Sequence, residues 1–170
     1  MASQTTEEIL KFVVKASGNE SLTPIVRTIL DLSGNSAEAE QAVGDLLTQL
    51  SDSQKLSTTL EQYKKVGASV RELSARYDET RLKVAELGKG LSATEAPTKK
   101  QQQEFEKARS ELAKLEKQYD TQLEKLRGYK SELTAAGIAT NSFGRAQSQI
   151  REQVTGVTTA LRGLETQARE

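Results

Sequence analysis

The sequence predicts an all-α protein with elongated coiled-coil helices, as a rod or a helical hairpin, and a small N-terminal head. The main observation is one heptad frame that runs without a slip from Leu56 to Ala168. Steps of seven from Leu56 form an a row and steps of seven from Thr59 form a d row, and both rows are mostly apolar. A mean spacing of 3.5 residues keeps such rows on one partner helix.

Composition supports the same class. Charged residues make up 28% of the 170 residues and aromatic residues 4%, which is too little large apolar surface for one big core. The apolar residues present are nevertheless periodic, so disorder is not expected in the heptad part. The sequence therefore divides into a head of short amphipathic segments at 1–54 and a heptad-repeat region at 55–170.

Charge changes along this division. The head holds three Lys/Arg against eight Asp/Glu, residues 55–91 hold eight against five, and residues 92–170 hold thirteen against eleven. An acidic head thus precedes a faintly basic heptad region. Neither part has the strong basic footprint of a nucleic-acid-binding protein, so no specific nucleic acid is expected as a partner.

The head begins with a segment that has two interpretations. Residues 9–16 alternate in polarity like a strand, whereas a helix that starts at Thr5 with Glu8 as its capping-box partner is the alternative. Farther on, Thr23 and Pro24 suit the N-cap and first position of a short helix. Its expected apolar face is Ile25, Ile29 and Leu32.

A second head helix is expected after the first one ends at Ser33, Gly34 and Asn35. Ser36 is a suitable N-cap for it. Its apolar face consists of Val43, Leu46, Leu47 and Leu50. Short amphipathic helices of this kind need cover from each other or from another chain.

The heptad region is expected to form three helices, at about 55–91, 96–136 and 142–168. The first break, near 92–98, follows from Gly88, Gly90 and Pro97, because proline inside a helix costs about 3 kcal/mol. The second break, near 137–142, follows from Gly137 as a C-cap and from Asn141 or Ser142 as the next N-cap.

Two arrangements of the first two heptad helices remain open. A hairpin about residues 95–104 would pair Val70 with Tyr129, Val84 with Leu115 and Leu87 with Leu112. A parallel coil of in-line rods would place like charges opposite each other at several flanking positions, at a few tenths of a kcal/mol each. The frame that persists across Pro97 favours the in-line rod, because a hairpin loop has no need to keep phase.

The apolar residues of the two rows are the candidate functional residues, as the seam of an oligomer. Along a straight rod they have no cover from their own chain, so self-association is expected, as a trimer if the family resemblance given below holds. The predicted seam consists of Leu56, Tyr63, Val66, Val70, Leu73, Tyr77, Val84, Leu87, Leu91, Phe105, Leu112, Leu115, Tyr119, Leu126, Tyr129, Leu133, Phe143, Ile150, Val154, Val157, Leu161 and Leu164.

No catalytic, cofactor-binding or metal-binding residues are predicted, and the chain is not expected to be an enzyme or to have a small-molecule substrate. It holds no cysteine and no histidine, which removes thiol and imidazole chemistry and the usual zinc ligands. Gly88-Lys89-Gly90 lacks the spacing of a phosphate-binding loop. No apolar run approaches the length of a membrane span, which indicates a soluble protein.

Several stretches resemble the N-terminal region of phage tail tape measure proteins. They are Ala96-Pro97-Thr98, residues 104–109 (EFEKAR), residues 126–143 (LRGYKSELTAAGIATNSF) and residues 150–161 with TTAL at 158–161. The resemblance covers roughly residues 60–170, with a weaker echo in the apolar segment 11–16. Its most telling part is the break at Ala136-Gly137-Ile138.

The resemblance implies a molecular ruler in the lumen of a phage tail tube, which sets tail length and is released during infection, at genome ejection. It implies tail-tube proteins, tail-tip proteins and tail assembly chaperones as partners, with the host cytoplasm as the place of assembly. It also implies that the chain is the N-terminal part of a longer protein. The alternative from the residues is a non-enzymatic coiled-coil adaptor or a helical module that binds membrane surfaces.

Overall fold

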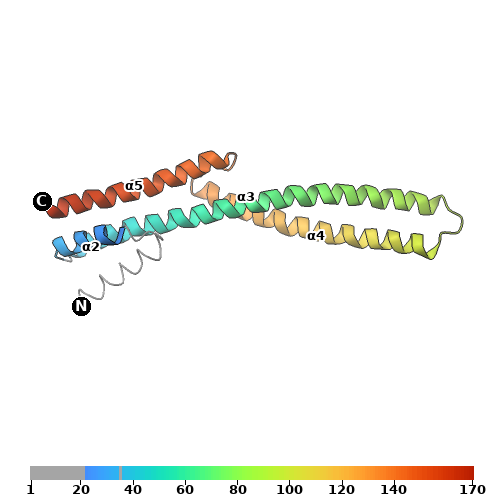
Figure 1. Cartoon of the computed structure of the whole chain (residues 1–170), viewed down its shortest axis with the longest axis horizontal. Coiled ribbons are helices and arrows are strands. Elements are labelled where there is room, and N and C mark those ends of the chain that lie inside the picture. Colours follow the sequence, from blue (N-terminus) through green and yellow to red (C-terminus); the bar gives the residue numbers. More distant parts are fainter. Residues whose placement is uncertain (1–21, 35) are drawn as a thin grey trace. The chain divides into compact units, whose positions relative to one another are not determined.

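The computed structural model describes residues 22–34 and 36–170. It contains α2 (Leu22–Leu32), α3 (Ala37–Ser92), α4 (Lys99–Ala135) and α5 (Phe143–Arg169) (Figure 1). These helices hold 89% of the described residues, and no strand occurs among them. The all-α prediction is confirmed for this part of the chain, whereas the strand or helix expected at 9–16 lies outside the described residues.

The chain divides into two compact units. Unit 1 comprises Met1–Leu60 and Glu132–Glu170, and unit 2 comprises Glu61–Ser131. Because α3 runs through residues 54 and 55, no helix boundary separates the expected head from the heptad region. The breaks expected near 92–98 and 137–142 correspond to the loops 93–98 and 136–142.

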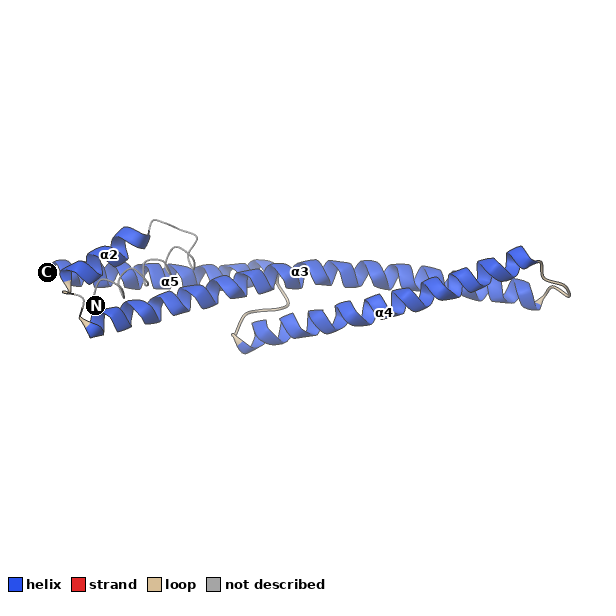
Figure 2. Ribbon diagram, turned by 90° about the horizontal axis from the view of Figure 1, so that it is seen from below, coloured by secondary structure: helices blue, strands red, loops and turns tan. Residues whose placement is uncertain are grey.

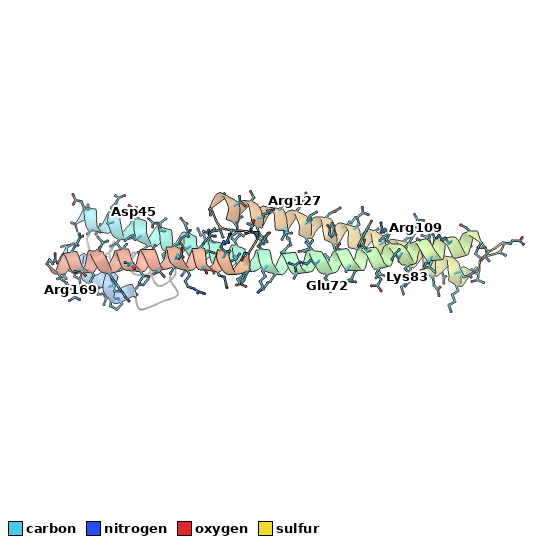
Figure 3. All side chains as sticks on the ribbon, turned by 90° about the horizontal axis from the view of Figure 1, so that it is seen from above. Asp45, Glu72, Lys83, Arg109, Arg127 and Arg169 are labelled. Atoms are coloured by element: carbon cyan, nitrogen blue, oxygen red, sulfur yellow. The ribbon has the colours of Figure 1, made fainter. Side chains whose placement is uncertain are left out.

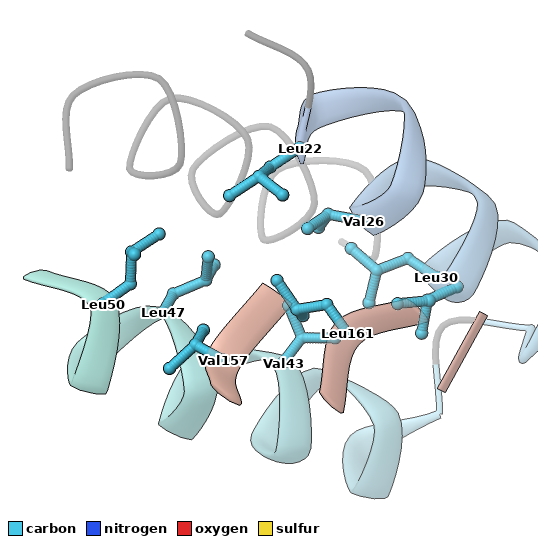
Figure 4. Close-up of a cluster of buried hydrophobic side chains, with 9 residues drawn as sticks. Leu22, Val26, Leu30, Val43, Leu47, Leu50, Val157 and Leu161 are labelled. Carbon is cyan, nitrogen blue, oxygen red and sulfur yellow. The ribbon is translucent and has the colours of Figure 1, made fainter. Parts of the chain in front are cut away.

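The core of unit 1 is built from α2, the first part of α3 and α5 (Figure 4). α2 packs against α5, and α5 runs antiparallel to the first part of α3 (Figure 1). Burial of each large aliphatic side chain contributes about 1.5–3 kcal/mol. The core residues are Leu22, Val26, Ile29, Leu30, Val43, Leu47, Leu50, Val157 and Leu161.

The buried face of α2 differs from the expected one. Leu22, Val26, Ile29 and Leu30 follow helical spacing and are buried, whereas Leu32 is 52% exposed. The expected N-cap is also wrong, because α2 begins at Leu22 and Thr23 lies within its first turn. The end of the helix agrees with the expectation, since Gly34 follows it with a φ of 67°.

α3 begins where expected and ends much later. Ser36 accepts a hydrogen bond from the Ala39 N–H through its hydroxyl oxygen (3.2 Å). The helix then continues past Leu50 to Ser92, so the second head helix and the first heptad helix are one element. Within it Ser53 is buried and its hydroxyl donates to Oε1 of Gln153 on α5 (3.1 Å), which satisfies a polar group in the middle of a helix.

Unit 2 is an antiparallel helical hairpin. The second part of α3 and most of α4 lie side by side in two perpendicular views (Figures 1 and 2). A Cβ built on Gly88 would lie 3.4 Å from Cε2 of Phe105, and one built on Gly67 would lie 3.8 Å from Cδ1 of Leu126. The chain therefore reverses within unit 2, and the in-line alternative is wrong there.

The register of this hairpin differs from the expected one. The expected hairpin placed Leu112 opposite Leu87, whereas Phe105 lies beside Gly88. The pairs Val70 with Tyr129 and Val84 with Leu115 are displaced in the same way. The second arm is thus shifted by about one heptad, because the turn is shorter than expected.

The short turn is explained by the start of α4. The Thr98 N–H donates to Oε1 of Gln101 (2.9 Å), and the Gln101 N–H donates to the Thr98 hydroxyl oxygen (3.2 Å). This reciprocal capping box satisfies two N–H groups at the helix start. It lets α4 begin at Lys99, directly after the loop that contains Pro97.

The connection from α4 to α5 lies in unit 1 and is closely hydrogen-bonded. Gly137 has a φ of 75°, the Ile138 N–H donates to Leu133 O (2.9 Å), and the Gly137 N–H donates to Thr134 O (3.0 Å). These bonds form a Schellman motif. Ser142 caps α5 by accepting from the Arg145 N–H (3.3 Å), so the expected C-cap and one of the two expected N-caps are confirmed.

Candidate interaction surface

The predicted seam residues are all buried or half-buried in the structure. Those buried are Val66, Leu73, Leu115, Leu133, Ile150, Val157 and Leu161. Those half-buried are Leu56, Tyr63, Val70, Tyr77, Val84, Leu87, Leu91, Phe105, Leu112, Tyr119, Leu126, Tyr129, Phe143, Val154 and Leu164. The two rows therefore mark the inward side of the helices in both units.

In unit 1 the seam residues of α5 pack within their own chain. Val157 and Leu161 belong to the core, and Val154 and Leu164 pack against it. Their partners are residues of α2 and of the first part of α3, which lie outside the heptad frame. The seam of α5 is thus already occupied in a single chain.

In unit 2 the two rows differ in burial. Val66, Leu73 and Thr80 of α3 and Ala108 and Leu115 of α4 belong to the d row and are buried between the arms. The a row has ten positions in unit 2: Thr98 lies exposed in the turn, and the other nine are half-buried, namely Tyr63, Val70, Tyr77, Val84, Leu91, Phe105, Leu112, Tyr119 and Leu126. We call the side of the hairpin that carries the a row its open face.

Neighbouring positions differ between the two rows. Beside the d row lie long exposed side chains such as Arg76, Lys83 and Lys125. The positions that flank the a row are mixed: Gly67, Ser74 and Gly88 of α3 are short, whereas the Arg109 guanidinium of α4 lies 5.7 Å from the centre of the Phe105 ring. The a row keeps part of its apolar surface in contact with water.

A groove of about 330 Å³ crosses the middle of the open face. It is lined by Ser74, Tyr77 and Asp78 of α3 and by Glu116, Tyr119 and Asp120 of α4. Both tyrosines are half-buried, whereas the three carboxylates are exposed. The groove therefore combines aromatic rings with negative charge.

Self-association was expected because the seam would have no cover within its own chain, and that premise is wrong. α5 covers its seam against α2 and α3, and the arms of unit 2 bury the middle of the d row. What remains for another molecule is the open face of unit 2. A trimer built on the whole seam would have to open the contacts within each chain.

Charged side chains are mostly exposed in the described part of the chain. Ion pairs join Arg109 to Glu106 (3.5 Å) and Arg169 to Glu165 (2.9 Å). Figure 3 shows Arg109 and Arg127 projecting from α4. Exposed pairs of this kind add little to stability.

The other motifs of the sequence have no further site around them. Gly88 and Gly90 lie inside α3, and the described residues contain no group of three or more acidic side chains arranged to hold a metal ion. No helix in the described ranges is long and apolar enough to cross a membrane.

The sequence did not reveal several residues that shape these surfaces. Leu22, Val26 and Leu30 form the buried stripe of α2, and their i, i+4 spacing was a signal that could have identified it. Ala108 was passed over as a small d-row residue, although it is 3% exposed. Thr80, by contrast, is a polar residue that its d-row position predicted to face the seam, and it is 9% exposed.

Compared with protein-family models, curated proteins and solved structures, the chain has no match. The likeness to tape measure proteins therefore depends on the residues quoted above.

Proposed function

We propose that this chain is the N-terminal region of a phage tail tape measure protein, a structural ruler that lies in the tail tube and leaves it during infection. The observation that supports the proposal most is the length of its helices, 56 residues in α3 and 37 in α4, with one heptad frame that runs through α3 from Leu56 onward and through all of α4. A mean globular helix has about 11–12 residues. By resemblance, its partners are tail-tube and tail-tip proteins and tail assembly chaperones.

The hairpin of unit 2 changes what such a ruler measures. At about 1.5 Å per residue, residues 61–92 span roughly 48 Å as one arm. The same unit opened into one line would span roughly 105 Å over residues 61–131. Tail length therefore distinguishes a hairpin that persists in the tail from one that opens there.

The test removes two heptads from each arm in the phage gene that carries this segment. Deletion of 71–84 from α3 and 109–122 from α4 takes residues that face each other in the observed register, and it keeps the heptad frame. Tails should shorten by roughly 42 Å if the unit lies in line, and by roughly 21 Å if the hairpin persists. Mean tail length by negative-stain microscopy is the measurement.

Deletion of 109–122 alone is the matched control. In an in-line rod it shortens the tail by roughly 21 Å and leaves assembly intact. In a hairpin it leaves 71–84 without a partner, and assembly should be impaired. Tails of unaltered length with the paired deletion would contradict a ruler role for unit 2.

The half-buried a row favours a second candidate, an adaptor or a module that binds membrane surfaces. Anionic lipid would be attracted by the basic residues that α3 carries in unit 2. All of them are exposed: Lys64, Lys65, Arg71, Arg76, Arg81, Lys83 and Lys89. Binding to vesicles with anionic lipid, lost at high salt, would support this candidate. Vesicles of neutral lipid are the control, and failure to bind either kind favours the ruler.

A further inference from the structure

The heptad frame crosses two breaks between helices without a change of phase, and the two breaks are built differently. At 136–142 the frame continues from Leu133 to Thr140. Gly137, with its φ of 75°, and the bonds of the Schellman motif fix the end of α4 there. The side chain of Gln149 holds the same connection through two hydrogen bonds. This break is therefore locked.

The break at 93–98 has no such lock. It contains no glycine, and its residues Ala93, Glu95 and Ala96 all favour a helix. The N–H of Ala93 still makes a helical hydrogen bond (3.0 Å) after the end of α3. Pro97 is the one residue in this break that a helix interior strongly disfavours. The loop is thus close in composition to the helices that it joins.

A closed hairpin does not need one heptad phase in both arms. Each arm has only to turn its own apolar stripe toward the other, whatever the phase of the loop between them. One phase matters when residues 61–131 form a continuous helix, because only then do both stripes lie on one side along its whole length. The frame that runs from Leu91 through Thr98 to Phe105 therefore has a use in an open chain and none in the closed hairpin.

We propose that the break at 93–98 is a hinge, and that two copies of this chain exchange their arms across it. Each copy straightens into one helix from α3 through α4, and the two helices lie antiparallel about a two-fold axis near Ala96. α3 of each copy then packs on α4 of the other. Exchange of an identical element in this way is a low-cost route to a dimer.

The contacts of the closed chain specify a second copy as the partner. Two neighbouring pairs, Gly67 with Leu126 and Gly88 with Phe105, are centred on the same point of the sequence, directly after Ala96. A two-fold axis at that point reproduces the whole seam of unit 2 in one register. Unit 1 is restored as well, because α5 of each copy reaches α2 and the first part of α3 of the other. Exchange thus keeps the apolar contacts of both units.

The closed form is the stable one for a chain at low concentration. Opening gives up the capping box of Thr98 and Gln101, and it places Pro97 inside a helix. It also brings Glu95 near its own copy at the axis. Exchange is therefore driven by the concentration of the chain. The inference goes beyond the proposed function, because exchange needs a second copy and no phage tail.

Mixed single-cysteine chains test the exchange directly, because the chain has no cysteine of its own. Gly67→Cys and Leu126→Cys chains are unfolded together in urea, refolded at high concentration and oxidised. Exchange places the two cysteines beside each other, so a disulfide-linked dimer with one chain of each kind should form.

Each single-cysteine chain refolded alone is the control. In the exchanged dimer the two Gly67→Cys positions lie roughly 90 Å apart across the axis, so neither variant should cross-link to itself. A second control mixes the two variants at low concentration after separate refolding. Closed hairpins keep each cysteine within its own seam, so this mixture should not cross-link either.

Variants of the hinge test what controls the exchange, with sedimentation equilibrium as the measurement. Pro97→Ala removes the residue that opposes the open form, and it should lower the dissociation constant of the dimer by more than about tenfold.

Insertions between Glu95 and Ala96 test the role of phase. Seven alanines keep the heptad frame and should preserve the dimer. Five alanines turn the stripe of α4 away from that of α3, and the chain should stay monomeric. The closed hairpin tolerates either insertion, and circular dichroism with thermal unfolding checks that both variants fold.

Three results would overturn the proposal. One is that the unchanged chain and Pro97→Ala both stay monomeric at the highest soluble concentration. Another is a dimer in which Gly67→Cys and Leu126→Cys do not cross-link, because the copies then meet through a different surface. The third is equal dimer formation with five and with seven inserted alanines, because phase then has no role.

Discussion

At the scale of single residues, two glycines in similarly open surroundings have opposite roles. Gly137 ends α4 with a φ of 75°, whereas Gly128 lies in the interior of the same helix. A Cβ at either position would meet no atom within 4 Å. Backbone conformation alone therefore decides whether an added methyl group raises or lowers the free energy of unfolding at each site.

Gly137→Ala should lower the free energy of unfolding by about 1 kcal/mol, because a left-handed conformation is strained for alanine. Gly128→Ala should raise it by about 0.5–1 kcal/mol, because alanine favours a helix interior. Urea unfolding followed by circular dichroism measures both. Changes of the same sign would contradict the conformation assigned to Gly137.

The side chain of Gln149 holds the connection between α4 and α5. Its Oε1 accepts from the Ala139 N–H (2.7 Å), and its Nε2 donates to Gly137 O (3.4 Å). Gln149→Leu should therefore cost about 1–3 kcal/mol of stability, because it leaves backbone groups without partners. Gln147→Leu, at an exposed position of the same helix, is the control and should change thermal stability little.

At the scale of helices and loops, the heptad frame predicted which side chains turn inward but not their register. Val66, Leu73 and Leu115 are buried as their period indicates. A seven-residue repeat looks the same after a shift of seven, so it does not distinguish one hairpin register from the next. The start of α4 fixes the register, and its signal was the pair Thr98 and Gln101.

The cap at Thr98 gives a prediction for this turn. Thr98→Ala removes the hydroxyl oxygen that accepts from the Gln101 N–H, and it should cost about 1 kcal/mol of stability. Thr121→Ala is the control, since Thr121 is exposed within α4 and alanine is the better helix former there. In thermal unfolding, the melting temperature of Thr98→Ala should therefore lie below that of the original chain. The melting temperature of Thr121→Ala should equal or exceed that of the original chain.

The core of unit 1 lay beyond what periodicity can predict. Val157 and Leu161 share the heptad rows with residues of unit 2, yet they pack with Val26 and Leu47. Contacts between segments more than one hundred residues apart are not encoded in local spacing. The open face was likewise not predicted, because both rows of a coiled coil are expected to be buried alike.

At the scale of the whole molecule, helix content is the most direct check of the all-α fold. Since helices hold 89% of the described residues, circular dichroism should show well over half helix. Ordinary globular proteins hold only roughly a third. A helix content below about half would contradict both the heptad interpretation and the four helices.

The division into units has a consequence for synthesis. Unit 2 is one continuous stretch, whereas unit 1 joins Met1–Leu60 to Glu132–Glu170. A ribosome that adds about 5–20 residues per second makes residues 132–170 in roughly 2–8 s, during which α2 has no α5 to pack on. The hairpin, whose contacts are closer in sequence, has time to close first. α5 is thus the helix that completes the core begun by α2 and the first part of α3.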